Sequence, residues 1–157
     1  ANVLPYIRRA FESLAMAKIS TSGPELVDLG YLSHPVTVCP DDHTLLGRAK
    51  AACRGLVVAG YEPPAPPVLT VLGEPIRAAF RAGIYNLQQG GYASDHDAAV
   101  ALQAAHALTG GDRVPGSVIT ESEILELELE GFLHLCGTEK TAARIKHVLD
   151  TGKPLRN

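Results

Sequence analysis

Residues 120–129 read Thr120-Glu-Ser-Glu-Ile-Leu-Glu-Leu-Glu-Leu129, and the structure of this stretch decides the fold class. From Glu123 onward acidic and aliphatic residues nearly alternate, and this period alone would indicate a strand. Leu and Glu are strong helix formers, however, and Thr120 and Glu123 have the spacing of a capping box. The early acids also complement the positive end of a helix dipole. We therefore predict a helix that extends from this cap to about Leu135.

Boundary signals of the same kind mark the other helices. Leu4, Ile7, Phe11 and Leu14 are spaced by three and four residues, as one face of an amphipathic helix requires. Capping residues, prolines and glycines bound the remaining helical segments. These are predicted over residues 24–29, after Asp41 or Asp42 as far as Gly60, from Glu74 to Gly90, from Ser94 to Gly110 and from Thr138 to Gly152.

The chain is therefore expected to be all-α, with about six helices. Only two short apolar runs favour strands, over residues 36–39 and 68–72, so at most one or two short isolated strands are expected. Aromatic residues make up 5% of the chain and Trp is absent. Leu, Val, Ile and Ala are therefore expected to fill the core.

A run of prolines divides the chain. Residues 62–67 read Glu-Pro-Pro-Ala-Pro-Pro. The fixed backbone angles and missing amide donors of proline exclude helix and interior strand, and they favour an extended connector. We therefore predict a first part over residues 1–60, a proline-rich linker over residues 61–72, and a second, helical part over residues 73–157.

Composition narrows the classes of partner and the compartment. The chain has 46% hydrophobic and 20% charged residues and a net charge of -3, so it lacks the basic excess of a protein that binds nucleic acid or an anionic membrane. No stretch is apolar enough to span a membrane, and Arg8, Arg9 and Glu12 stand where a signal peptide would be apolar. The 3 cysteines form no paired motif, which favours neither a disulfide framework nor a zinc site. A cytoplasmic protein is expected.

Polar clusters in the sequence are better explained by structure than by catalysis or metal binding. Ser94-Asp95-His96-Asp97 has the pattern of a helix cap, and His106 lies well off the helix face of His96. Residues 137–141 lack the residue order of a phosphate-binding loop. We expect surface or packing positions for His34, His43, His134 and His147, and burial as small hydrophobes for Cys53 and Cys136.

Residues 16–32 resemble a segment of the crotonase (enoyl-CoA hydratase/isomerase) family, in which a helix is followed by a small residue, a glutamate, a short helix and a glycine. The opening Met-Ala-Lys-Ile-Ser-Thr-Ser is more similar to one branch, the bacterial multifunctional 3-hydroxyacyl-CoA dehydrogenases that carry a crotonase-like domain. Residues 90–97, 108–112 and 132–157 resemble the same branch, above all in the ending Thr151-Gly-Lys-Pro-Leu-Arg-Asn157.

The resemblance implies the C-terminal helical region of a fatty-acid β-oxidation enzyme. In this interpretation residues 1–60 are the C-terminal part of a crotonase-like domain and residues 73–157 are a helical extension. The family's oxyanion-hole amides, catalytic carboxylates and nucleotide loop lie upstream of the matched segments, so no catalytic or metal-binding residue is assigned in this chain. NAD and CoA thioesters are implied for the parent enzyme. The expected partners are the remainder of that enzyme and a second copy of the chain.

Two other functions stay open beside this structural or oligomerising role. A residual enoyl-CoA hydratase would use acids such as Glu25 or Asp28, although both are expected in a capped helix without oxyanion donors. A CoA-binding module would use the basic C-terminal tail, where Lys153 and Arg156 are the candidate contacts to CoA phosphates.

Overall fold

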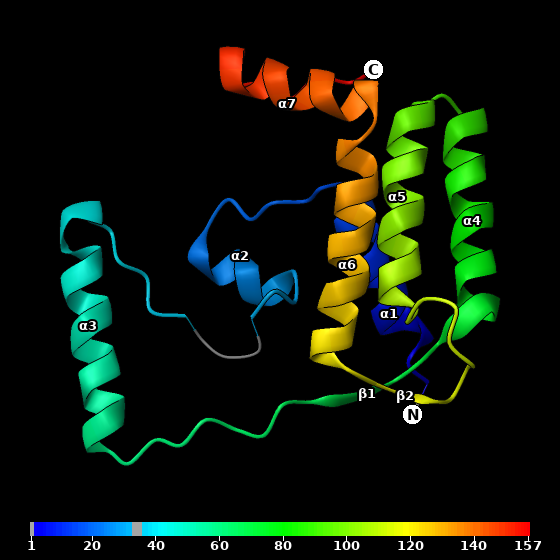
Figure 1. The fold of residues 1–157 in the computed structure, drawn as a ribbon. Helices are drawn as coiled ribbons and strands as arrows, with labels where there is room; N and C mark the ends of the chain where they lie inside the picture. Colours follow the sequence, from blue (N-terminus) through cyan, green and yellow to red (C-terminus); the bar gives the residue numbers. More distant parts are fainter. Residues whose placement is uncertain (1, 33–35) are drawn as a thin grey trace. The chain divides into compact units, whose positions relative to one another are not determined.

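The computed structural model describes residues 2–32 and 36–157, and this part of the chain is mainly helical (Figure 1). It contains seven helices and one small antiparallel sheet of two strands, so the predicted all-α class is confirmed. None of the described helices is long and apolar enough to cross a membrane. In chain order the elements are α1 Leu4–Ala15, α2 Gly23–Asp28, α3 Asp42–Val58, β1 Val68–Thr70, α4 Gly73–Gln89, α5 Asp95–Leu108, β2 Val118–Thr120, α6 Glu121–Cys136 and α7 Glu139–Thr151.

The stretch that decides the fold class is helical, and it begins with a reciprocal cap. The Thr120 hydroxyl accepts a hydrogen bond from the Glu123 amide at 3.3 Å, and the Glu123 carboxylate accepts one from the Thr120 amide at 2.8 Å. Amides that the first turn of a helix leaves without partners are thereby satisfied. Ser94 and Asp97 form the same arrangement at the start of α5. Both interpretations of these residues as caps are confirmed.

Residues 36–39, which favoured a strand in the sequence, do not form one. Val36 and Val38 instead lie against the start of α2, where a Cβ built on Gly23 would be 2.9 Å from Val38 Cγ2 and 3.4 Å from Val36 Cγ2. The alternating apolar residues therefore pack on a helix, and the predicted strand is wrong.

The second predicted strand forms, but it is not isolated. β1 pairs antiparallel with β2, with Val68 opposite Thr120 and Thr70 opposite Val118. The sequence did not indicate β2, because a strand of three residues carries too little periodicity to be recognised. Its central residue, Ile119, is 1% exposed. The two strands therefore form one small sheet that anchors the segment before α6 to the segment before α4.

The chain forms two compact units. The larger unit comprises Ala1–Lys18 and Pro66–Asn157, and the smaller unit comprises Ile19–Ala65. The boundary after residue 65 falls in the predicted proline run. α1 is grouped with the helices that follow that run, because it packs on α5. The predicted division into residues 1–60, 61–72 and 73–157 places α1 in the first part instead. The assignment of residues 1–60 to a crotonase-like domain stays a prediction.

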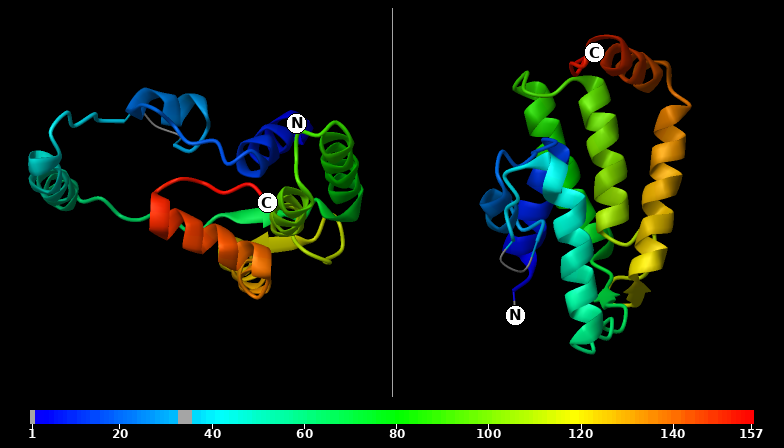
Figure 2. Two further views of the ribbon diagram at one scale, coloured as in Figure 1. Left: turned by 90° about the horizontal axis from the view of Figure 1, so that it is seen from above. Right: turned by 90° about the vertical axis from the view of Figure 1, so that its left-hand side faces the viewer.

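In the larger unit α5 is the central helix (Figures 1 and 2). It packs against α4, α6 and α1, and α7 follows α6 across the end of the unit. Ala98, Ala101 and Ala105 are buried along α5. Because alanine has the smallest apolar side chain, these positions let the neighbouring helices come close to the α5 backbone.

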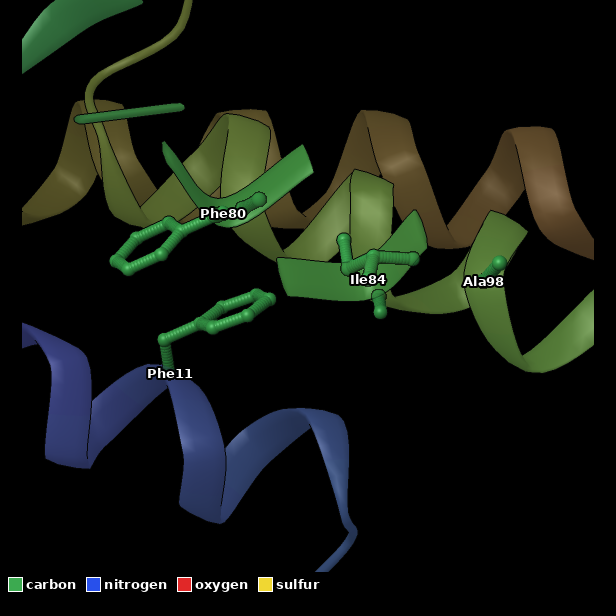
Figure 3. Packing of buried hydrophobic residues seen from close by; sticks show 6 residues of the cluster. Phe11, Phe80, Ile84 and Ala98 are labelled. Atoms are coloured by element: carbon green, nitrogen blue, oxygen red, sulfur yellow. The ribbon is translucent and has the colours of Figure 1, made fainter. Parts of the chain in front are cut away.

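Two phenylalanines fill the space beside these alanines. Phe11 of α1 stacks on Phe80 of α4, with ring centroids 4.1 Å apart and an interplanar angle of 12° (Figure 3). Ile84 adds a buried aliphatic side chain from α4 to the same cluster. The stack therefore joins α1, which precedes the smaller unit in the sequence, to α4, which follows it.

The expectation of a purely aliphatic core needs correction. Two of the chain's three phenylalanines lie at its centre, and no leucine is among the buried residues of the described part. Leucines instead lie on outward faces, for example Leu125 and Leu129 of α6.

The smaller unit contains α2 and α3. Ser22 caps α2, and Gly30 follows the helix with a φ of 82°, in the left-handed region that favours glycine after a helix C-terminus. α3 buries none of its residues. Cys53 on α3 is therefore exposed, so its predicted burial is wrong, whereas Cys136 of α6 is partly buried.

Replacing Phe11 by alanine is expected to lower the free energy of unfolding of the larger unit by about 3–5 kcal/mol, because it removes a buried ring and leaves a cavity beside Phe80. Urea unfolding followed by circular dichroism measures the loss. Tyr6→Ala is the control, since Tyr6 lies on the same helix and is 77% exposed. Equal midpoints for the two variants would show that the stack does not hold α1.

Candidate functional site

An apolar groove lies between α1, α5 and α6 within the larger unit, and we take it as the candidate site. Its volume is about 400 Å³, within the range of sites that bind small ligands or side chains. The groove is lined by Leu14 of α1, by Val100, Gln103, Ala104, Ala107 and Leu108 of α5, and by Ile124, Glu128, Gly131, Phe132 and Leu135 of α6.

Small residues shape the floor of this groove. Gly131 of α6 is buried, and a Cβ built on it would lie 3.2 Å from Gln103 Oε1 on α5. The two helices therefore come close at this point because α6 has no side chain there. Ala104 and Ala107 add little bulk from α5. Phe132 is 58% exposed and extends the apolar surface out of the groove.

The lining residues limit the chemistry of the groove. Gln103 and Glu128 are its only polar side chains. One amide and one carboxylate do not supply the acid–base pair or the oxyanion donors that acyl chemistry needs. The groove is therefore suited to binding apolar groups.

Arg77 forms a polar cluster that fastens α4 to the segment after α5. Its Nε donates to Glu74 Oε2 at 2.8 Å and its Nη2 donates to Asp112 Oδ1 at 2.7 Å. Its Nη1 donates to the Gly111 carbonyl at 3.2 Å and lies 2.6 Å from His106 Nδ1. Because a guanidinium can only donate, His106 Nδ1 is the acceptor and the ring proton is assigned to Nε2.

The cations of this cluster are already matched by carboxylates. Arg77, Arg81, His106 and Asp112 border a second cavity of about 430 Å³. Glu74 pairs with Arg81 and with Arg77, and these two cations lower its pKa to about 2. The cluster therefore has a structural role, since its positive charge is neutralised within the fold.

A second polar cluster ties α7 and the C-terminal tail to α5. Arg144 Nη2 donates to Asp97 Oδ1 at 2.8 Å, and Arg144 Nε donates to Asn157 Oδ1 at 2.8 Å. Asn157 Nδ2 donates in turn to the Lys140 carbonyl at 3.2 Å. Arg144 thus links the Ser94-to-Asp97 cap of α5 to the C-terminal tail.

His96 lies beside this cluster and is 5% exposed. Its Nε2 is 2.9 Å from Thr141 Oγ1 of α7. Burial, together with the charges of Arg144 and Lys140, lowers the pKa of His96, so the ring is neutral near pH 7. His96 therefore joins α5 to α7 by a partly buried hydrogen bond.

The two candidate CoA contacts take no part in the hydrogen bonds described for α7 and the tail. Lys153 and Arg156 are both exposed in the segment after α7, and the structure does not test their contact with CoA phosphates. Another basic residue of the C-terminal segment, Arg144, forms an ion pair with Asp97 inside the larger unit.

The other candidate residues from the sequence lie at helix starts or at exposed or partly buried positions of the described part of the chain. Glu25 lies in the first turn of α2 and accepts from the Thr21 amide and hydroxyl at 2.6 Å each, and these hydrogen bonds lower its pKa. Asp28 is exposed. Thr138 in residues 137–141 caps α7, and its hydroxyl accepts from the Thr141 amide at 3.3 Å. His43 and His134 are exposed and His147 is partly buried, whereas His34 lies outside the described residues.

The strand-to-helix junctions do not fit a dinucleotide. A pyrophosphate site needs free amides at a helix N-terminus and a glycine-rich approach. At the β2–α6 junction Thr120 caps the helix and two glutamates lie in its first turn. At the β1–α4 junction a Cβ built on Gly73 would meet the Pro115 ring at 2.5 Å, so this glycine is already covered. In residues 2–32 and 36–157 no group of three His, Cys, Asp or Glu side chains could hold a metal ion.

Sequence reasoning did not single out Arg77 or the groove. Besides Glu74, the side-chain partners of Arg77 are His106 and Asp112, 29 and 35 residues away, and the local sequence does not reveal these long-range contacts. The groove depends on three helices, and only Gly131 inside a leucine-rich helix hints at a close approach.

Comparison with known proteins relates the chain to part of a metabolic enzyme. It is 36% identical over 149 residues to a probable 3-hydroxyacyl-CoA dehydrogenase of Bacillus subtilis (strain 168). The match covers 95% of this chain and 19% of that protein, so the chain is homologous to a portion of it and spans about a fifth of its length. No protein-family model matches the chain. No solved structure matches it either.

The Asp97–Arg144 contact predicts a loss of stability in acid. Burial opposes ionisation of Asp97, but hydrogen bonds from Ser94 and Arg144 outweigh it, and the pKa of Asp97 lies below its usual 3.8. The unfolded chain therefore takes up the proton first, and stability falls as the pH drops below about 4. Asp97→Asn should cost about 1–2 kcal/mol at pH 7, and this difference should narrow in acid.

Urea unfolding between pH 2.5 and 7 measures this difference. Asp95→Asn is the control, because Asp95 lies in the same turn and does not pair with Arg144. A difference between Asp97→Asn and the unmodified chain that stays constant over the whole range would contradict the prediction.

Arg77→Lys is expected to destabilise the larger unit by about 1–2 kcal/mol, because a single ammonium cannot replace the fork that reaches Glu74 and Asp112 together. Thermal and urea unfolding measure the change. Arg113→Lys serves as the control, since its pair with Glu123 is 39% and 38% exposed and should contribute within about 0.5 kcal/mol. Equal losses in the free energy of unfolding for the two variants would contradict the prediction that Arg77 contributes more than an exposed ion pair.

Proposed function

We propose that the chain is a helical region of a fatty-acid β-oxidation enzyme, and that it packs against the rest of that enzyme without carrying chemistry of its own. The observation that carries the proposal is the apolar groove, whose lining continues into exposed apolar residues. Such a surface is typical of an interface, because monomeric proteins rarely expose a continuous apolar patch.

Homology supports the metabolic context. The matched protein is a probable 3-hydroxyacyl-CoA dehydrogenase, and the chain corresponds to 19% of it. In the proposal, NAD and CoA thioesters are bound by the rest of the enzyme, which also supplies the catalytic groups. This division agrees with the covered and capped strand-to-helix junctions described above.

The polar clusters support a structural role. The guanidinium groups of Arg77 and Arg144 are paired with carboxylates inside the larger unit. Charged groups that are matched in this way fix the relative positions of helices and are not available to a substrate. The region would thus present a rigid apolar face to its partner.

A chimera tests the proposal. Three proteins are compared: the Bacillus subtilis relative, the same protein without its matched portion, and the same protein with that portion replaced by this chain. Deletion should lower the melting temperature and the NAD-dependent oxidation of 3-hydroxyacyl-CoA, and replacement should restore both, because an uncovered apolar interface destabilises the enzyme.

The isolated chain is the control for chemistry. Incubated with crotonyl-CoA, it should leave the enoyl absorbance unchanged. Turnover above background, or a deletion protein with the stability and activity of the intact relative, would overturn the proposal.

A further inference from the structure

α6 carries an outward apolar stripe that no described element of the larger unit covers. We define the α6 stripe as Leu125, Leu129, Phe132 and Leu133, which are 55%, 56%, 58% and 60% exposed. At about 100° per residue these side chains fall within an arc of about 100°. Their spacing of four, three and one residues is that of a helix face that packs on another helix. Phe132 also lines the groove, so stripe and groove form one surface.

Glutamates border the stripe on both sides. On the helical wheel Glu121 and Glu128 flank one edge, and Glu126 and Glu130 flank the other. All four are exposed, and within the described part of the chain none of them has an ion-pair partner. α6 contains no Lys or Arg. The edges of the stripe are therefore uniformly negative.

The charge pattern disfavours a second copy of the same helix. Two α6 stripes packed together would bring acidic edges against acidic edges, and like charges at these flanking positions select against a pairing. A partner helix with basic edges would instead find opposite charges on both sides of its apolar face. Such pairs add specificity and faster association to the contact of the apolar stripes.

We propose that the α6 stripe binds an amphipathic helix whose aliphatic face is flanked by Lys or Arg. The mode is that of a helix laid along an apolar surface, with side chains spaced by three and four residues as anchors. This inference rests on the proposed function, since the helix would belong to the rest of the enzyme, and it specifies the chemistry of that partner.

Designed peptides test the proposal with the full chain. One 21-residue helical peptide has a leucine stripe flanked by Lys, and a second has the same stripe flanked by Glu. Fluorescence anisotropy at low salt should show at least tenfold tighter binding of the Lys peptide. The preference should shrink as salt rises, because the edge charges are exposed.

Variants of α6 locate the binding surface. Leu129→Asp should weaken binding of the Lys peptide at least tenfold, while Leu149→Asp, at an 80% exposed position of α7, should leave it unchanged. Glu126→Lys with Glu130→Lys should reduce or reverse the preference between the peptides. All of these sites are exposed, and circular dichroism with urea unfolding checks that each variant keeps the fold.

The outcomes are decisive in each direction. Equal affinity for the two peptides, or binding that Leu129→Asp leaves intact, would overturn the inference. So would a dimer of the chain that Leu129→Asp dissolves in sedimentation, because the occupant would then be a second copy. If the chimera restores activity and the Lys peptide fails to bind, the proposed function stands and only the partner chemistry is wrong.

Discussion

The stacking of Phe11 on Phe80 is the interaction on which the rest of the larger unit depends. It holds α1 against α4 and α5, although the whole smaller unit separates α1 from them in the chain. With α1 in place, Leu14 supplies the third wall of the apolar groove. Without it, α5 and α6 would form an open two-helix surface. A single ring pair thus connects the packing of the core to the shape of the candidate site.

Most helix boundaries could be predicted because their causes are local. Thr120 with Glu123 and Ser94 with Asp97 are reciprocal caps within one turn, and the structure contains both. What could not be predicted depends on partners distant in the sequence. The pairing of β1 with β2 is one such case. The pattern of residues 36–39 predicts a strand, because periodicity does not reveal that these residues pack against Gly23 at the start of a helix.

The candidate site was less predictable than the fold. Alanines on α5 and Gly131 on α6 look like ordinary small residues until three helices come together around them. The core was expected to contain leucines, yet Leu125, Leu129 and Leu133 of α6 are exposed, because they lie away from the side of that helix that contacts α5. Arg77 and Arg144 gain their roles from contacts across the fold. Residue type alone did not distinguish them from surface cations.

The interruption of the larger unit by residues 19–65 affects how tolerant the fold is to change in that segment. Bringing α1 back to α4 closes a loop, and the entropy lost in closing a flexible loop grows only with the logarithm of its length. A doubling of the loop length therefore lowers the free energy of unfolding by only about 0.6 kcal/mol. The burial of two phenylalanine rings outweighs such an increment several times over. A longer or shorter intervening segment should therefore change the stability of the larger unit little, which makes this segment a permissive place for insertion.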